Sequence, residues 1–161
     1  MNEYWITDIT LDKPQNVDMV YAPKGVARCT GCFGCWLKTP SECVMHDGKQ
    51  GIGEMLTNRE TVRIISKITY GGFSAPVKRV LDRSISGVLP FFSKRHGRMH
   101  HAVRYDTKPT FYITFYDCSE LSEEEKELAK RAATAMAINM NCKECTVNFI
   151  DKNICTLEDI I

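Results

Sequence analysis

The sequence predicts a single α/β domain with a mostly parallel sheet of four or five strands. Strand-like runs alternate with helix-like segments through the last two-thirds of the chain, which is the pattern of strand–helix–strand units. The 161 residues are 43% hydrophobic and 25% charged, a composition that suits one globular core. No linker rich in Gly, Ser or Pro interrupts them, so we expect one domain over residues 1–161.

The first half of the chain predicts three strands and one weak helix. Tyr4–Leu11 (YWITDITL) is the first strand, and Val17–Tyr21 is a short second one. Val62–Tyr70 (VRIISKITY) is the clearest buried strand of this half, and Glu54–Asn58 is a weak helical stretch. Because residues 12–16 are too few for the crossover that adjacent parallel strands require, either the first two strands form a hairpin or the sheet has lost an element.

A helix is predicted directly after the third strand. Ser74 is a suitable N-cap, and Pro76 is favoured in the first turn of a helix. The apolar residues that follow recur at helical spacing and predict one buried face, made of Val77, Val80, Leu81, Ile85 and Val88.

The last third predicts two more strands and another helix. Thr110–Tyr116 (TFYITFY) is a strong strand and Thr146–Ile150 is the last one, while Leu157–Ile161 begins a short final helix. Between the strands, Ser122 and Glu125 form a capping box that opens a longer helix. The buried stripe predicted for this helix is Leu128, Ala132, Ala135, Met136 and Met140.

Charge and hydropathy exclude several classes of function. Lys and Arg number 21 against 20 Asp and Glu, so a net charge of +1 gives no general attraction to nucleic acid or to an anionic membrane. The sequence holds no apolar run of membrane-spanning length. Its first residues lack the basic and apolar regions of an export signal, so we expect a cytoplasmic protein whose eight cysteines are mostly reduced.

Half of the cysteines gather in one loop, which is the most specific signal in the sequence: Cys29, Cys32, Cys35 and Cys43. Two-residue gaps let successive thiolates of a turning loop point inward, as an iron–sulfur cluster requires. Gly31 and Gly34 would allow such a tight loop. From the residues alone, a four-cysteine zinc site and a set of inert buried thiols remain open as alternatives.

The cysteine motif and a second motif, Tyr70-Gly-Gly-Phe-Ser-Ala-Pro-Val-Lys-Arg-Val-Leu-Asp-Arg83, together resemble the flavodoxin-like NAD(P)H-dependent FMN reductase family. The compact cysteines are similar to those of its iron–sulfur flavoprotein branch. The resemblance covers residues 17–150 and implies a flavodoxin-like three-layer sandwich that binds FMN, often as a dimer. It also implies NAD(P)H as electron donor and an iron–sulfur cluster on the four cysteines.

The resemblance also implies where FMN would lie. The turn that matches the family's loop beside the isoalloxazine ring is Tyr70, Gly71, Gly72, Phe73 and Ser74. This turn lies where a strand passes into a helix, and ligands of open α/β sheets bind at the carboxyl ends of strands. Its glycines would let a flat ring approach the backbone. A plain strand–helix turn is the alternative reading of the same residues.

The chain departs from the family at its N-terminal end. Family members carry a Ser/Thr/Gly-rich loop after the first strand, whose N–H groups wrap the FMN phosphate. Here Gly25 is the only glycine before Cys29, so we expect a short member whose N-terminal strand–helix unit is reduced or missing. The basic segment Ser93–Tyr105, with Arg98 and Arg104, could hold a phosphate instead. A solvated loop is the other reading of that segment.

The resemblance implies an electron-transfer flavoprotein or NAD(P)H-dependent FMN oxidoreductase, with a cysteine-ligated iron–sulfur cluster as in its iron–sulfur flavoprotein branch. Its partner would be a small-molecule redox substrate or a redox protein, and we expect a homodimer with no nucleic-acid or membrane partner. We expect the Gly-Gly turn and the four cysteines to share one pocket, and no residue is assigned a catalytic role. The alternative is a flavodoxin-like domain without flavin that serves as a metal-stabilised binding or assembly module.

Overall fold

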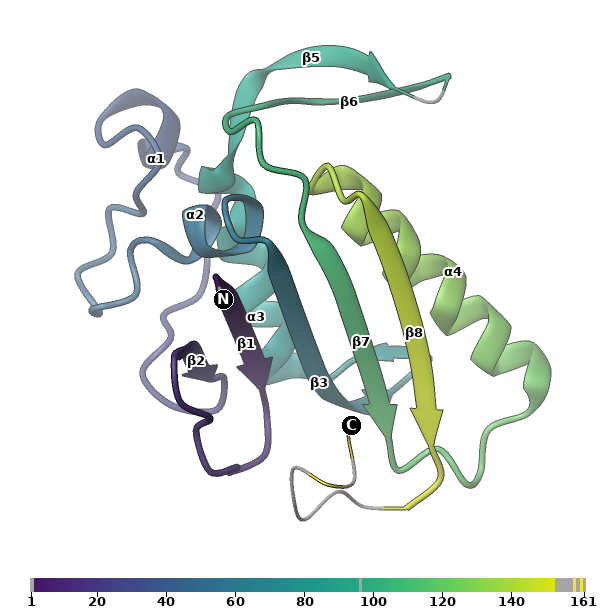
Figure 1. Cartoon of the computed structure of the whole chain (residues 1–161). Helices are drawn as coiled ribbons and strands as arrows, with labels where there is room; N and C mark the ends of the chain where they lie inside the picture. The colour runs from purple at the N-terminus through teal and green to yellow at the C-terminus, as the bar shows by residue number, and fades with distance from the viewer. Residues whose placement is uncertain (1, 96, 153–157, 159, 161) are drawn as a thin grey trace.

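The computed structural model describes residues 2–95, 97–152, 158 and 160. The main sheet is formed by five parallel strands in the order β2-β1-β3-β7-β8 (Figure 1). Their bounds are β1 Glu3–Thr7, β2 Val17–Tyr21, β3 Thr61–Thr69, β7 Thr110–Tyr116 and β8 Glu144–Ile150. The short strand β4 (Gly72–Phe73) folds back antiparallel on the end of β3. The predicted mostly parallel sheet is therefore confirmed, and its order is the 2-1-3-4-5 order of flavodoxin.

The first two strands are parallel neighbours, so the predicted hairpin is wrong. Their register pairs Glu3 with Val17 and Thr7 with Tyr21. The strand ends at Thr7, earlier than predicted, because the Thr7 hydroxyl accepts a hydrogen bond from Ile9 N–H (3.1 Å) and turns the chain. Residues 8–16 then run as a loop back to the start of β2, which is long enough for a crossover without a helix.

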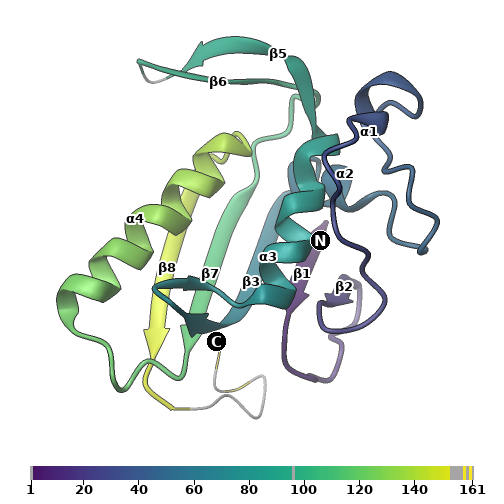
Figure 2. The same ribbon diagram turned by 180° about the vertical axis from the view of Figure 1, so that it is seen from behind.

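The two longest helices among the described residues lie along one face of the sheet. Figures 1 and 2 show α3 and α4 together on that face, where the larger core cluster forms. The bounds are α1 Gly34–Leu37, α2 Ile52–Thr57, α3 Ala75–Asp82, the 3-10 helix η1 Arg83–Gly87, and α4 Glu123–Asn139. As predicted, Val77, Val80 and Leu81 of α3 are buried against the sheet.

The longest helix, α4, confirms one prediction and corrects another. Ser122 Oγ accepts from Glu125 N–H (3.2 Å) and the Glu125 carboxylate accepts from Ser122 N–H (2.9 Å), which completes the predicted capping box. The predicted buried stripe is wrong at Leu128, which is 58% exposed, whereas Met136 and Met140 pack against the core as predicted. The buried residues are Ala129, Ala133 and Ala137, whose small side chains let the helix lie close to the sheet.

The opposite face of the sheet carries a smaller core cluster, in which Trp5, Leu11, Val17, Ile65 and Tyr116 are buried. All of its members come from strands and loops, so the described residues form two layers where three were predicted. This follows from the reduced N-terminal unit, which the sequence did predict.

Polar and aromatic side chains cover the face of the sheet that has no helix layer. The Arg63 guanidinium lies over the rings of Trp5 (5.7 Å) and Tyr112 (4.7 Å) and donates a hydrogen bond to Glu3 (2.7 Å). Along β8, Thr146 and Asn148 are exposed on this side, whereas Cys145, Val147 and Phe149 pack on the other. A strand of a parallel sheet is usually buried on both faces, so this alternation marks the missing layer.

The basic segment Ser93–Tyr105 folds mostly as strand and not as a solvated loop. It belongs to an antiparallel ribbon of β5 (Val88–Arg95) and β6 (Arg98–Val103), which lies beyond the amino ends of the main strands (Figure 1). Arg104 donates to the carbonyls of Ser86 (3.1 Å) and Val88 (3.4 Å). The phosphate-binding role considered for this segment is therefore wrong for a flavin at the carboxyl edge.

The predicted final helix over Leu157–Ile161 lies mostly outside the described residues. Among the described residues, no helix has both the length and the hydropathy needed to cross a bilayer.

Candidate functional site

The carboxyl edge of the sheet is the first candidate site. In open α/β sheets, ligands bind where the strand order reverses, beyond the carboxyl ends of the strands. Here the order reverses between β1 and β3, so the loops after these two strands flank the site (lower edge in Figure 1). The predicted turn Tyr70–Ser74 lies at this edge. It contains β4 and ends directly before α3.

Two residues of this edge have a left-handed backbone, which is unfavourable for residues other than glycine. Tyr70 has φ 50° and Asp117, directly after β7, has φ 61°. The side chain of Tyr70 is fully exposed. A bulky residue in this conformation costs roughly 1–2 kcal/mol, and such strain gathers at binding and active sites. An exposed aromatic ring held in this way suggests a surface for a flat ligand.

Asp8, the first residue after β1, joins three elements at the carboxyl edge. Its carboxylate accepts hydrogen bonds from Lys67 N–H (3.0 Å), from Tyr116 Oη (3.0 Å) and from Ser74 Oγ. Burial, followed by the neighbouring Asp8 charge, holds the pKa of Tyr116 well above its ordinary value, so this phenol stays a donor. Since Ser74 Oγ is bound to Asp8, it does not cap α3, although Ser74 occupies the predicted N-cap position.

The carboxyl edge suits the ring of FMN but not its phosphate. Gly71 and Gly72 leave the backbone open beside the exposed ring of Tyr70, and an added Cβ on either glycine would meet open space. A phosphate needs free N–H or O–H donors at the loop after the first strand. The donors that reach this position, from Lys67, Ser74 and Tyr116, are bound to the Asp8 carboxylate. These three groups therefore offer no free donor to the phosphate of FMN.

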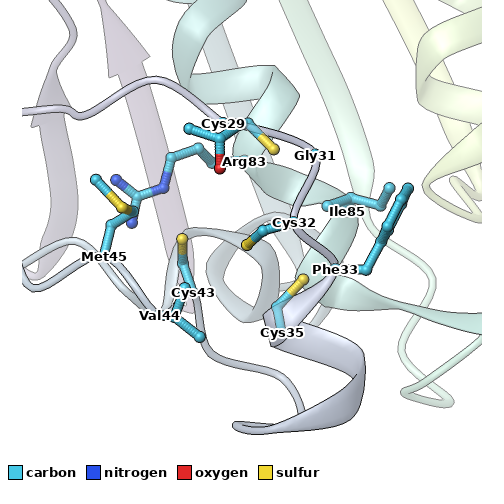
Figure 3. A pocket seen from close by; sticks show the side chains of 11 residues that line it. Cys29, Gly31, Cys32, Phe33, Cys35, Cys43, Val44, Met45, Arg83 and Ile85 are labelled. Atoms are coloured by element: carbon cyan, nitrogen blue, oxygen red, sulfur yellow. The ribbon is translucent and has the colours of Figure 1, made fainter.

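The second candidate site is a small cavity beside η1. Figure 3 shows the sulfur atoms of Cys29, Cys32, Cys35 and Cys43 turned toward a common space, with Arg83 close by. Cys35 is buried, Cys43 is partly exposed, and Cys29 and Cys32 are exposed. Burial, and then the nearby Cys43, raises the pKa of Cys35. Hydrogen bonds from the Gly34 backbone and the Thr30 side chain lower the pKa of Cys32.

The four cysteines have the right donor chemistry for a soft metal, but their arrangement is too open to hold one. Among the described residues, no three His, Cys, Asp or Glu side chains converge closely enough to share an ion. The cavity has a volume of only about 30 Å³. Coordination would therefore require the loop to close further around the metal, as happens when metal binding is coupled to folding.

The cysteine loop is fixed to the rest of the molecule by a buried ion pair. The Arg83 guanidinium is buried and pairs with the Asp47 carboxylate, which also accepts from Ala27 N–H (2.8 Å) and Lys49 N–H (3.0 Å). Burial works to raise the pKa of Asp47, but the hydrogen bonds from Arg83 and from these two amides outweigh it and lower the pKa to about 2. Arg83 and Asp47 thus tie both ends of the loop to η1.

The two glycines predicted to allow the tight cysteine loop have distinct roles. Gly31 has φ 66°, a conformation that favours glycine. At Gly34, an added Cβ would come within 2.6 Å of a methyl group of Val44, so the loop can close only on a residue without a side chain.

A row of aromatic rings connects the cysteine loop to the β5–β6 ribbon. Phe33 stacks on Trp36 (5.1 Å between centroids), Trp36 lies against His101 (5.2 Å), and His101 stacks on Phe92 (4.9 Å). The Trp36 indole donates to the carbonyls of Ile85 (3.1 Å) and Val88 (2.9 Å). The sequence gives no sign of this row, because Phe33 and His101 are 68 residues apart and its members share no motif.

The two candidate sites lie near opposite ends of α3. The cysteine cavity is lined by residues 29–45 with Arg83 and Ile85, whereas Gly72 and Phe73 line a separate groove between α3 and α4. The eight residues of α3 extend about 12 Å between them. The common pocket expected from the sequence is therefore not formed by the described residues.

Comparison with known proteins supports the fold. No family model and no curated protein matches the chain. Among solved structures it is similar to an FMN-dependent NADH-azoreductase from Bacillus anthracis in complex with FMN, with a TM-score of 0.55 and 9% identity over 94% of this chain and 88% of that chain. The chain has a flavodoxin-like fold. This confirms the predicted fold class. At 9% identity the similarity is evidence for the fold and not for the function.

Proposed function

We propose that this flavodoxin-like chain is a flavin-dependent oxidoreductase whose flavin ring lies on the Tyr70–Ser74 turn. The exposed, left-handed Tyr70 in the turn after β3, at the carboxyl edge of the sheet, is the observation that carries the proposal. The fold likeness to an FMN-dependent NADH-azoreductase supports it. A nicotinamide nucleotide would be the electron donor, and a small molecule or a redox protein the acceptor. When bound, the flavin supplies the hydride and single-electron chemistry.

The chain's own residues position the ring. Tyr70 offers one face for stacking, and Gly71 and Gly72 let the ring edge approach the backbone. Ser66 Oγ accepts from Ser74 N–H (2.9 Å) and so fixes the end of the turn. Lys67 and Asp117 form an ion pair (2.7 Å) at the rim, which orders the loop after β7.

Replacing Tyr70 with alanine is expected to weaken flavin binding about two- to twelvefold, because a stacked aromatic pair contributes about 0.5–1.5 kcal/mol. Quenching of flavin fluorescence on titration measures this. Since the Tyr70 side chain is fully exposed, the unfolding temperature should stay unchanged. Phe91→Ala is the matched control, because Phe91 is also exposed but lies on the ribbon at the opposite edge. Equal affinity of Tyr70→Ala and the native chain would contradict the assignment of the ring site.

A second proposal concerns the cysteine cavity. We propose that Cys29, Cys32, Cys35 and Cys43 hold an iron–sulfur cluster after the loop closes around it. The observation in favour is that the four side chains, from two separate stretches of the loop, turn toward one space. Arg83 lines the same space, and its pairing with Asp47 holds the two ends of the loop in place around the four thiols.

Anaerobic purification with iron, zinc and sulfide measured on one sample tests the cysteine proposal. We expect iron and sulfide in the native chain and their loss in Cys35→Ser, with Cys142→Ser, which lies outside the loop, as the matched control. Zinc without sulfide would contradict the cluster and indicate a zinc site. Protein free of both metals would contradict the proposal and indicate four inert thiols. Colourless protein that takes up no flavin would favour the alternative function, a metal-stabilised binding module. The homodimer stays a prediction, which sedimentation equilibrium can check.

A further inference from the structure

We propose that the flavin site selects against the flavin phosphate, so that the chain binds riboflavin more tightly than FMN, and that Asp8 sets this preference. The inference rests on the proposed function, since it concerns the same site. It also implies that flavin is exchanged as a substrate here, because the phosphate that would retain it as a resident cofactor has no place to bind.

Asp8 lies at the switch point of the sheet. It follows β1 directly, at the point between β1 and β3 where the strand order reverses. In folds of this kind an anionic ligand group binds at that point, on donors of the first loop and of the helix behind it. In this chain the loop over residues 8–16 leads straight into β2, so Asp8 stands where such a loop would begin.

Three hydrogen-bond donors at this edge bind the Asp8 carboxylate. Lys67 N–H at the end of β3, Ser74 Oγ at the start of α3 and Tyr116 Oη at the end of β7 all bind the Asp8 carboxylate. These groups come from three elements and converge on one point, as donors do around a bound anion. Asp8 is thus an internal anion that occupies an anion site. Pro76 in the first turn of α3 removes one more backbone donor that a phosphate could use.

The rim of the site carries negative charge. Asp117 lies at the same rim, and Lys67 Nζ pairs with it (2.7 Å), while the Asp8 charge is held by three donors of which none carries a positive charge. A phosphate placed here would meet the negative charge of Asp8 at short range. The side chains of Lys78 and Asp82 pair with each other farther along α3, so Lys78 is not free to compensate. A neutral ribityl chain meets no such repulsion.

Riboflavin and FMN should therefore be titrated into the native chain at one low ionic strength, with flavin fluorescence as the readout. We expect FMN to bind about fivefold more weakly than riboflavin, and the difference to shrink as salt is added. Asp8→Asn keeps the size of the side chain and removes its charge. It should tighten FMN binding about tenfold and change riboflavin binding by less than twofold.

Arg79→Gln is the matched charge variant, because it also changes the charge by one unit and Arg79 lines a separate groove with Arg28, Cys29 and Ala75. Under this proposal it leaves the ratio of the two affinities unchanged. Tighter binding of FMN than of riboflavin by the native chain, or a ratio that depends on Arg79 and not on Asp8, would overturn the inference and leave the proposed function standing. If the native chain binds neither flavin, the proposed function itself fails.

Discussion

Arg83→Ala is expected to lower the free energy of unfolding by about 3–5 kcal/mol, since removing one partner of a buried ion pair leaves the other charge uncompensated. The Arg83 side chain is fully buried and also donates to the carbonyl of Lys49 (3.1 Å), so the substitution releases the cysteine loop as well. Urea unfolding at pH 7 measures the change. Asp82→Asn is the control, because the exposed Lys78–Asp82 pair should contribute less than about 0.5 kcal/mol.

The same ion pair predicts a pH dependence of stability. The pKa of Asp47 is lowered to about 2 in the folded chain, below its ordinary value of 3.8. The stabilisation is therefore present in full above about pH 4 and is lost as the pH falls through 2, and it amounts to about 2 kcal/mol. In Arg83→Ala this part of the acid dependence should flatten, because the folded-state pKa returns toward the ordinary value. An unchanged acid profile would contradict the role of the pair.

Gly53→Ala is expected to destabilise the fold by about 3 kcal/mol, at the upper end of the range for overpacking. Gly53 in α2 packs directly on the 3-10 helix η1, and an added Cβ would overlap Ser86 Oγ and the backbone nitrogen of Gly87. At Gly87 an added Cβ would meet the Gly53 carbonyl in the same way. Two backbones in contact cannot yield as a flexible side chain would, so the helices must separate.

Gly51→Ala is the matched control for Gly53→Ala. Gly51 stands two residues earlier at the N-cap of α2, its φ of −83° suits any residue, and an added Cβ meets open space. We expect a change within about 0.5 kcal/mol. Thermal or urea unfolding of both variants makes the comparison. A small effect of Gly53→Ala, similar to that of Gly51→Ala, would show that α2 and η1 can move apart freely.

Much of the fold could be predicted because its signals are local. Val17–Tyr21 and Thr110–Tyr116 are strands with the predicted bounds, since runs of β-branched and aromatic residues favour strand wherever they are buried. The Ser122 capping box was predictable because its two partners are three residues apart. The buried face of α4 was not predictable from the sequence, because either Leu128 or Ala129 could face the sheet. Ala129 is the buried one, since its small side chain lets the helix pack closely.

The candidate site could be predicted only in part. The Tyr70–Ser74 turn and the four cysteines stand out in the sequence, but the contacts that define their chemistry join residues far apart. Asp8 meets Ser74 and Tyr116 across the sheet edge, and Asp47 meets Arg83 across the cysteine loop. Neither pair has a fixed spacing that a motif could record.

The sequence by itself determined the strands of the main sheet and the two longest helices in their order, the helix start at Ser122 and the gathering of four thiols in one loop, because each depends on neighbours within a few residues. The tertiary structure alone decided that β1 and β2 are parallel, that the two motifs lie near opposite ends of α3, and that a carboxylate occupies the anion position of the sheet. Strand register, helix placement and donor convergence are set by packing between distant segments, and such packing leaves no local pattern in the chain.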